Sequence, residues 1–432
     1  MVPVSARAPL NSASPMLRAI RILLVPLIVL AATRLLLTEV GILSSHSAVE
    51  ATLGDVLYFA HAAFGLVQGH TPYQPGFLTA PAQGLPYLYP PVALLITVPA
   101  VLAGSNYLAA FSIEVLILSL VGCVALGYFA RRIRVLAPLS LTTAVLLAAT
   151  GPLWLTRVDS IQGILVAGSA LALIGERRAL AVALVALACL VKETALLAAV
   201  PVGLWCLLSD PVEPSPRTVR IRTFLLGLGP ALLIFAIFLV WSRGGVVTSS
   251  LASVHRGMEI ESIPASVAIA LGHFVPVRPY FGRFASWELR ASDASVLALI
   301  SSFLGGIVIV LGSALFALAH RRPATAISFA IAVGLCAAPV LSPQYLLDLL
   351  PTLAVTACVE VPGRVGARLT LLGLLIGILT QAEFPYLFDE VVRLQPPGLI
   401  VLFLRNGLLV LAAGFLTRQV PWSRLRTLGG GQ

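Results

Sequence analysis

The feature that most constrains this chain is a succession of apolar runs, roughly 15 to 25 residues long, separated by short clusters of arginine. A helix needs about 20 apolar residues to cross the hydrocarbon core of a bilayer. The composition agrees, because 59% of the residues are hydrophobic and only 11% are charged, against about 25% charged in soluble domains. The sequence therefore predicts an all-α polytopic membrane protein.

The basic charge does not indicate nucleic acid as a partner. A net charge of +10 would suit such a partner if the cations formed one patch. Here the arginines lie between apolar runs, which is how the orientation of a membrane protein is specified. The five cysteines lie in or beside apolar segments without the spacing of a zinc site, so we interpret them as small core residues: Cys123, Cys189, Cys206, Cys336 and Cys358.

The arginine clusters also predict the topology, because such clusters stay in the cytoplasm. We expect a basic leader over residues 1–21, one transmembrane domain over residues 22–417 and a cytoplasmic tail over residues 418–432. Several of the predicted crossings are shorter than a full span, which would leave a recess for a lipid-linked substrate. The twelve crossings cover residues 22–37, 108–130, 136–155, 161–175, 179–191, 194–208, 224–241, 296–319, 324–341, 345–358, 369–381 and 399–416.

One further apolar run, Val92 to Gly104, decides whether this topology holds. If the run crossed the membrane, the arginine cluster that begins at Arg131 would face outward, against the rule. The run is also short, and prolines before and within it disfavour a continuous spanning helix. We therefore expect a juxtamembrane helix inside a first outer loop, residues 39–107.

Polar side chains that could carry chemistry are concentrated in the predicted outer loops, which include a long loop over residues 242–293. Asp55 is the candidate catalytic residue. It is the second residue of a stretch, Gly54 to Pro91, that is too polar to cross a bilayer and too aromatic for a slack linker. The alternative for Asp55 is an exposed loop residue or a helix cap. The candidates for substrate binding are Tyr89, Arg157, Asp159, Lys192, Glu193, His255, Arg256, Glu259, Glu261, Gln344 and Tyr345.

Two pairs of these candidates lie at predicted outer helix ends. Arg157 and Asp159 form either an interfacial ion pair, worth about 0–1 kcal/mol if exposed, or a site where the arginine holds a phosphate or carboxylate by two parallel hydrogen bonds. Lys192 and Glu193 interrupt a long apolar run, and ionisable groups at that depth usually mark a site. A solvated turn between two short helices is the alternative for this second pair.

Two further segments hold the remaining candidates. If residues 255–262 were helical, His255 and Arg256 would each share a face with Glu259; the alternative is a solvated turn. Asp348 follows the segment Ser342-Pro343-Gln344-Tyr345 inside an apolar run, so we expect it to face inward. The sequence holds no Walker loop, GxGxxG, HExxH or serine elbow and no pattern of a soluble nucleotide-sugar domain. A sugar donor would therefore have to come from the membrane.

Several of these segments resemble bacterial glycosyltransferase family 87, the α-1,2-mannosyltransferase-like membrane enzymes with the GT-C fold. The resemblance begins with the loop after Gly54-Asp55, with GHTPY and YLYPPVALLITVP. It continues through RVDSIQGILVAGSALAL, LVKETALLAAVP, SVHRGMEIESIPAS, LSPQYLLDLLP, TQAEFPYLFDEV and LRNGLLVL. The resemblance implies a GT-C fold and a polyprenyl-phosphate donor of a hexose, typically mannose. It also implies a glycolipid or glycan acceptor outside the bacterial plasma membrane, and Asp55 as the base.

The chemistry implied by this resemblance needs no cofactor, and it demands no metal if cationic side chains stabilise the leaving phosphate; whether a divalent metal is used stays open. A carboxylate such as Asp55 can take the proton of an acceptor hydroxyl, and a single displacement inverts the anomeric carbon. Arg157, Lys192, His255 and Arg256 are the candidates to stabilise the departing lipid phosphate. The SPQYLLDLLP segment lacks the histidine found in the family, so the sugar and the acceptor stay open, as does the oligomeric state.

Two other classes of function stay open beside this one. A transporter or flippase of lipid-linked sugars would show inverted repeats and paired broken helices, and the sequence has no clear internal repeat. A polysaccharide polymerase or ligase would use a pyrophosphate-linked oligosaccharide instead of a phosphate-linked monosaccharide.

Overall fold

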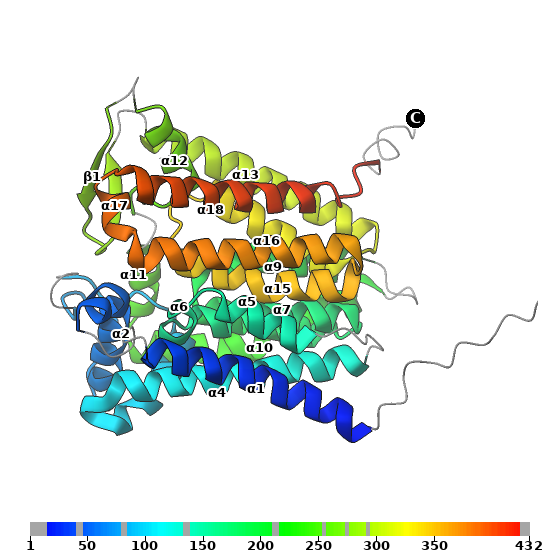
Figure 1. Ribbon diagram of the computed structural model, residues 1–432. Helices are drawn as coiled ribbons and strands as arrows, with labels where there is room; N and C mark the ends of the chain where they lie inside the picture. Colours follow the sequence, from blue (N-terminus) through cyan, green and yellow to red (C-terminus); the bar gives the residue numbers. More distant parts are fainter. Residues whose placement is uncertain are drawn as a thin grey trace, which may run out of the picture.

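The computed structural model describes residues 15–39, 46–78, 84–132, 139–209, 216–252, 256–272, 276–290 and 294–423. The longer helices run side by side and form one bundle (Figure 1). Bundle helices come in the chain order α1 (Pro15–Glu39), α4 (Tyr107–Arg132), α5 (Leu139–Ala148), α7 (Asp159–Ile174), α8 (Arg178–Val191), α9 (Leu196–Leu208), α10 (Arg217–Trp241), α13 (Ala294–Leu318), α14 (Pro323–Ala337), α15 (Leu346–Val355), α16 (Arg364–Gln381) and α18 (Pro396–Thr417).

Shorter elements gather at one end of this bundle, the left-hand end in Figure 1, where α2, α11, α17 and β1 are labelled. We call it the loop end. Its elements are α2 (His46–Val67), α3 (Pro91–Thr97), η1 (Pro99–Asn106), α6 (Leu153–Thr156), η2 (Glu193–Ala195), α11 (Gly245–Ala252), α12 (Ile263–Ala270), β1 (Arg278–Phe281), β2 (Trp287–Arg290), η4 (Pro343–Tyr345), η6 (Ala382–Tyr386) and α17 (Phe388–Val392). The remaining element, η5 (Thr356–Glu360), follows α15 at the opposite end.

The opposite end, which we call the arginine end, is held together by its own polar contacts. Glu360 accepts hydrogen bonds from the backbone N–H groups of Ala324 and Thr325, at 2.9 and 2.8 Å, and so caps the start of α14. An Arg322 guanidinium N–H donates to the side-chain oxygen of Gln419 at 2.6 Å. Helix α1 begins and α18 ends at this arginine end (Figure 1).

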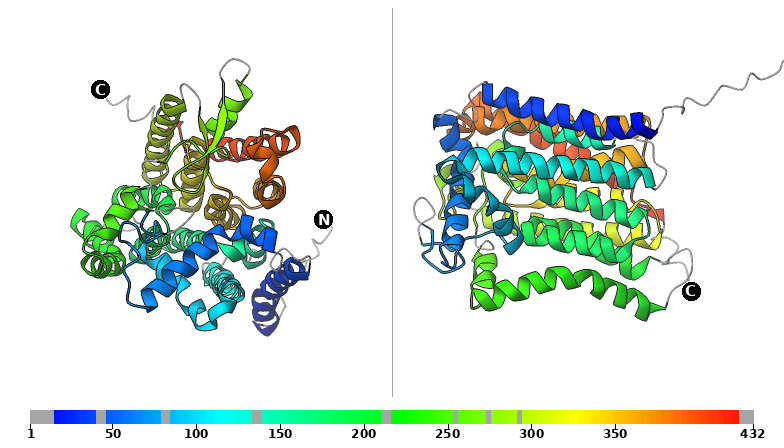
Figure 2. Two further views of the ribbon diagram at one scale, coloured as in Figure 1. Left: turned by 90° about the vertical axis from the view of Figure 1, so that its left-hand side faces the viewer. Right: turned by 90° about the horizontal axis from the view of Figure 1, so that it is seen from below.

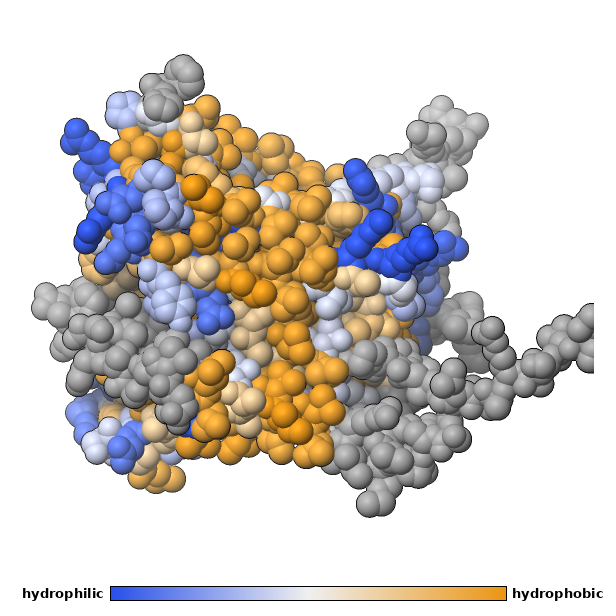
Figure 3. All heavy atoms as spheres, in the orientation of Figure 1, coloured by the Kyte–Doolittle hydropathy of each residue, from blue (hydrophilic) through white to orange (hydrophobic). Residues whose placement is uncertain are grey.

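One face of the bundle is apolar between these two ends. Figure 3 shows hydrophobic side chains across the middle of one face and hydrophilic side chains toward the left and right. In the described part of the chain, five helices are long and apolar enough to cross a membrane: Pro99–Ala130, Arg217–Trp241, Ser295–Leu318, Arg364–Tyr386 and Pro396–Thr417. The prediction of a helical membrane protein is therefore confirmed.

Two of the shorter bundle helices, α14 and α15, lie inside the bundle. All ten residues of α15 are buried, and an apolar helix can be buried on every side only when other helices surround it. Each of the twelve segments predicted to cross overlaps a bundle helix. The number of crossings stays a prediction, because helices such as α5 and α15 are too short to span a bilayer alone.

Much of the predicted first outer loop forms regular structure. Residues 46–67 form α2, which crosses the loop end of the bundle, as the two views of Figure 2 show. The run Val92 to Gly104 is broken: α3 ends at Thr97, and η1 contains Gly104 with φ of 57°, outside the helical region. Proline at the start of each short helix explains why the run does not form one continuous helix.

Candidate functional site

Asp55 lies within α2 and faces the bundle. Its carboxylate Oδ2 is 2.9 Å from Nε of Arg157, and the side chain is 37% exposed whereas that of Arg157 is 5% exposed. The alternative of a helix cap is wrong, because α2 begins at His46, well before Asp55. The ion pair therefore leaves a carboxylate that is held in place and still accessible.

Aromatic rings form a wall beside Asp55. The rings of Tyr58 and Tyr87 stack with centroids 5.2 Å apart, and the ring of Phe59 meets that of Tyr89 edge-on at 5.0 Å. The Tyr73 hydroxyl donates to the backbone carbonyl of Tyr89 at 3.1 Å. Because Tyr87 is fully buried, the segment that carries Tyr89 is fixed against α2 by packing and hydrogen bonds together.

Lys192 and Asp159 form a second, buried ion pair. Nζ of Lys192 is 2.6 Å from Oδ1 of Asp159, and their side chains are 5% and 0% exposed. The ammonium also lies over the rings of Tyr345, at 4.1 Å from the centroid, and Tyr89, at 5.4 Å. Burial lowers the pKa of Lys192, whereas the negative charge of nearby groups, Asp159 first among them, raises it. The raising effects together are larger, so the pKa lies above its ordinary value and the ammonium stays charged.

These pairs bear on two alternatives from the sequence. Arg157 pairs with Asp55 and Asp159 pairs with Lys192, so each of the two residues has an ion-pair partner on another element. The alternative of a solvated turn at Lys192 is wrong, because that side chain is enclosed. Arg157 follows α6 in an extended conformation, and Lys192 directly follows α8. Because α7 packs closely on α8, both cations lie in the same region of the loop end.

A second carboxylate lies near Lys192. Asp348 is 2% exposed, as the expectation of an inward-facing side chain requires. Its Oδ2 accepts a hydrogen bond from the Thr194 hydroxyl at 2.6 Å, and Thr194 accepts one from the Gln162 amide at 2.8 Å. Asp159 Oδ2 and Asp348 Oδ1 are buried without a hydrogen-bond donor among the described residues. A buried acceptor without a donor costs about 1–3 kcal/mol, so both oxygens suit a hydroxyl donor.

The segment that begins at Arg256 completes the cluster. Arg256 forms an ion pair with Glu259, and one of its N–H groups donates to the Tyr345 hydroxyl at 3.4 Å. The Ser342 hydroxyl donates to Glu259 Oε2 at 2.9 Å. The segment around Glu259 is not helical, because Glu259 forms a β-bridge with Glu288. His255, the remaining candidate of this segment, lies outside the described residues.

A buried ion pair that is not among the candidates from the sequence holds this segment in place. Arg405 in α18 is 2.7 Å from Glu383 Oε2, and both side chains are 0% exposed. Arg405 also donates to the backbone carbonyl of Glu261 at 2.6 Å, and the Asn406 amide donates to the same carbonyl at 3.2 Å. The signal was the Arg-Asn pair inside the apolar segment LRNGLLVL, since charged residues at such depth face a partner.

Three candidates lie at the edge of the cluster. Burial raises the pKa of the Glu261 carboxyl well above its ordinary value, and the neighbouring Glu383 and Glu259 raise it further, so Glu261 is suited to holding a proton. Glu193 in η2 and Gln344 in η4 are half-buried. Glu193 directly follows Lys192 in the chain, and Gln344 directly precedes Tyr345. The connected candidates are Asp55, Tyr89, Arg157, Asp159, Lys192, Arg256, Glu259 and Tyr345.

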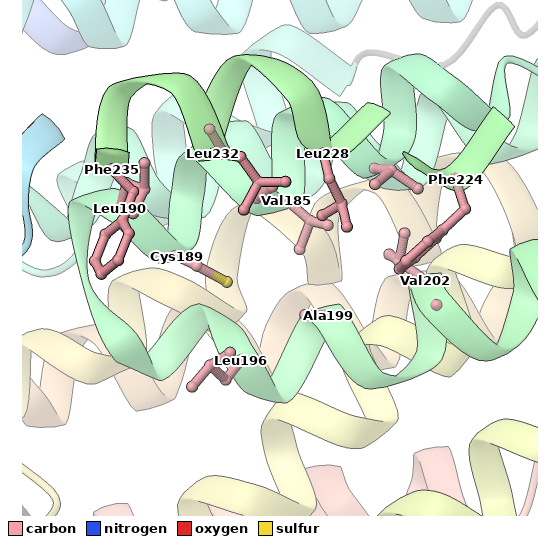
Figure 4. Close-up of a pocket in the computed structure, with 14 residues that line it drawn as sticks. Val185, Cys189, Leu190, Leu196, Ala199, Val202, Phe224, Leu228, Leu232 and Phe235 are labelled. Atoms are coloured by element: carbon pink, nitrogen blue, oxygen red, sulfur yellow. The ribbon is translucent and has the colours of Figure 1, made fainter. Parts of the chain in front are cut away.

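An apolar cavity of about 250 Å³ lies between α8, α9 and α10. Figure 4 shows that its labelled side chains are hydrocarbon apart from the thiol of Cys189. Leu190 and Leu196, which line one part of the cavity, flank Lys192 in the chain. The lining has no charge or hydrogen-bonding side chain to bind a polar group, so a hydrocarbon chain is the ligand that it suits.

Comparison with protein-family models finds no match for this chain, and comparison with curated protein sequences finds none either. The resemblance to glycosyltransferase family 87 therefore stays a prediction from the motifs. Among the described residues, no group of three or more histidine, cysteine, aspartate or glutamate side chains is arranged to hold a metal ion.

Proposed function

We propose that this protein is an integral-membrane glycosyltransferase with the GT-C fold. In this proposal it moves a hexose, with mannose as the first candidate, from a polyprenyl phosphate to a hydroxyl of an outer-leaflet glycolipid or cell-envelope glycan. The observation that supports it most is the accessible Asp55 carboxylate, held by Arg157 beside the buried Lys192–Asp159 pair. Twelve crossings of the plasma membrane, with the loop end outside, are part of the proposal.

Asp55 acts as the base in this mechanism. The acceptor hydroxyl oxygen attacks the anomeric carbon while its proton passes to the Asp55 carboxylate. The bond between that carbon and the phosphate oxygen breaks, so the lipid phosphate leaves with the electron pair and the configuration inverts. Arg157 fixes the carboxylate through the 2.9 Å contact, which keeps one orientation for the proton transfer.

The departing phosphate gains negative charge, and the cluster supplies cations for it. Arg157, Lys192 and Arg256 each already have a carboxylate partner. A guanidinium has five N–H donors in a planar fork, more than one carboxylate can accept, so Arg256 can hold the phosphate without leaving Glu259. Lys192, enclosed by Tyr89 and Tyr345, contributes mainly as a fixed positive charge.

The hydrocarbon part of the donor needs a place of its own. The apolar cavity between α8, α9 and α10 lies among helices of the bundle and adjoins Lys192 through Leu190 and Leu196. A prenyl chain in this cavity would bring its phosphate toward Lys192. This cavity supports the proposal of a lipid-linked donor, because its lining is hydrocarbon and Leu190 and Leu196 flank Lys192 in the chain.

Substitution of Asp55 by asparagine tests the proposal. Asparagine keeps the size of the side chain but cannot accept the hydroxyl proton, so we expect transfer from polyprenyl-phosphate mannose to fall by about 10²–10⁴-fold. Sugar transfer is measured with purified protein in detergent, at equal amounts of folded protein. Asp389→Asn in α17 is the matched control, because Asp389 is an exposed acid at the same end, and it should keep full activity. Turnover of Asp55→Asn within a few-fold of wild type would remove Asp55 from the mechanism.

A transporter of lipid-linked sugars is the second candidate, because buried charges such as Lys192, Asp159 and Asp348 also mark transport pathways. The two functions separate in proteoliposomes that contain polyprenyl-phosphate mannose. A glycosyltransferase consumes the lipid-linked sugar only when an acceptor is added. A transporter changes its distribution between leaflets and leaves the sugar attached to the lipid.

A further inference from the structure

A second cavity, of about 470 Å³, opens at the loop end. Three elements line it: the segment after α2 through Pro75 and Leu85, the helix α11 through Thr248, and the β1–β2 hairpin through Tyr280 and Arg283. This volume lies within the roughly 300–1,000 Å³ of ligand pockets. Unlike the cavity between α8, α9 and α10, it is lined by both apolar and hydrogen-bonding groups.

The hairpin is built so that its polar groups have fixed positions. Tyr280 pairs with Glu288 across the two strands, and the Tyr280 hydroxyl donates to the Glu288 carboxylate. The guanidinium of Arg290 lies over the Tyr280 ring at 4.8 Å from its centroid. Because Glu288 is 4% exposed, the wall that it forms with Tyr280 is rigid, whereas Arg283 at the turn is exposed and can reach a ligand.

The cavity adjoins the Asp55 cluster on its α2 side. Phe284 and Leu85, which line the cavity, pack in one apolar cluster with Tyr58 and Leu88. Tyr58 lies one helical turn after Asp55, and its hydroxyl accepts the backbone N–H of Leu88. The same short segment that lines the cavity therefore also carries Tyr89 toward Lys192.

The cavity adjoins the cluster on the hairpin side as well. A Cβ at Gly257 would lie 2.2 Å from Glu288 Oε2, so this carboxylate packs directly against the backbone that follows Arg256. The Glu259 backbone pairs with Glu288 in a β-bridge, and the Leu289 N–H donates to the Met258 carbonyl at 2.8 Å. The hairpin thus extends the strand-like segment that presents Arg256 and Glu259.

We propose that this cavity binds the saccharide part of the acceptor, a proposal that rests on the glycosyltransferase function. A sugar ring has a rim of hydroxyls and faces of C–H groups, and both kinds of surface need a partner. Arg283, Glu288 and the Thr248 hydroxyl supply hydrogen-bonding groups, while Phe284 and Leu85 supply apolar surface. Tyr58, which packs with Leu85 and Phe284, lies between this cavity and Asp55, so a saccharide held here lies next to the Asp55 cluster.

Arg283→Ala tests the assignment, with Arg278→Ala as the matched control on the same hairpin. Both arginines are exposed, but only Arg283 lines the cavity. Octyl α-mannoside serves as the acceptor and polyprenyl-phosphate mannose as the donor. Loss of a charged hydrogen bond should raise the KM for octyl α-mannoside by roughly tenfold or more in Arg283→Ala. The KM for the donor should not change, and Arg278→Ala should match wild type. An equal acceptor KM in the two variants would overturn the proposal.

Binding without turnover separates this inference from the proposed function. Saturation-transfer NMR is recorded with the protein in detergent and the methyl α-glycosides of mannose, glucose and galactose. We expect transfer to at least one of them in wild type and Arg278→Ala, and a clear loss in Arg283→Ala and Thr248→Val. Absence of transfer in wild type, or no loss in the variants, would contradict a saccharide site. Binding in a protein that transfers no sugar would reject the glycosyltransferase and keep the site.

Discussion

At the residue scale, the loop end is organised by ion pairs that differ in burial. Arg157–Asp55 is open to solvent on its acidic side, whereas Lys192–Asp159 and Arg405–Glu383 are enclosed. Enclosed pairs add little net stability, but removal of one partner leaves an unpaired buried charge. The open pair is therefore suited to chemistry, and the enclosed pairs hold the surrounding elements in register.

The Lys192–Asp159 pair gives a prediction for stability. Lys192→Met leaves the Asp159 carboxylate buried without its cation, so we expect a loss of about 3–5 kcal/mol in the free energy of unfolding. Addition of Asp159→Asn removes the unpaired charge and should restore most of that loss. Thermal unfolding in detergent measures the two variants and the wild type.

The control for this cycle is Arg368→Met, an exposed cation at the arginine end. It should change the unfolding free energy by less than about 0.5 kcal/mol. If the double variant Lys192→Met/Asp159→Asn were less stable than Lys192→Met alone, the two residues would not be coupled as a buried ion pair.

At the element scale, the site depends on how closely α7 and α15 approach. The two helices meet at Gly163, where a Cβ would lie 2.1 Å from the backbone carbonyl oxygen of Leu347. Asp159 lies one turn before Gly163, and Asp348 follows Leu347 directly. The absence of a side chain at position 163 therefore decides how near the Asp159 and Asp348 carboxylates lie to Lys192.

Gly163→Ala should force α7 and α15 apart. We expect a loss of about 1–3 kcal/mol in unfolding free energy, because extra atoms in a packed contact displace the backbone. Gly229→Ala in α10 is the control, since a Cβ there meets nothing within 4 Å. That control should be neutral or stabilising by about 0.5–1 kcal/mol, as alanine favours a helix interior over glycine. Equal thermal unfolding of the two variants would mean that the helices separate without cost.

At the scale of the whole molecule, the two ends of the bundle differ in charge. The site of paired charges and aromatic rings lies at the loop end, while Arg321, Arg322 and Arg364 lie at the arginine end. Arginine-rich connections stay in the cytoplasm. We therefore expect Asp55 to lie outside when the apolar band of Figure 3 lies in a membrane.

Cysteine labelling in intact cells tests this orientation. In a background with the five native cysteines replaced, Arg283→Cys should react with a membrane-impermeant maleimide added outside. Arg132→Cys, at the end of α4, should react only after the cells are permeabilised. Labelling of Arg132→Cys from outside would mean that the topology is inverted or that residues 92–104 cross the membrane.

The sequence by itself determined the helical membrane class and the position of each bundle helix, because apolar length and arginine clusters are local properties of the chain. It also singled out Asp55, Lys192 and Arg256, which are polar groups beside apolar runs. Only the tertiary structure decided the partners: Asp55 with Arg157, Asp159 with Lys192, and Arg405 with Glu383. These contacts join residues far apart in the chain, and they depend on which helix faces pack together. Periodicity and composition carry no information about that packing. From the sequence alone, the same ionisable residues are therefore compatible with several sets of ion pairs.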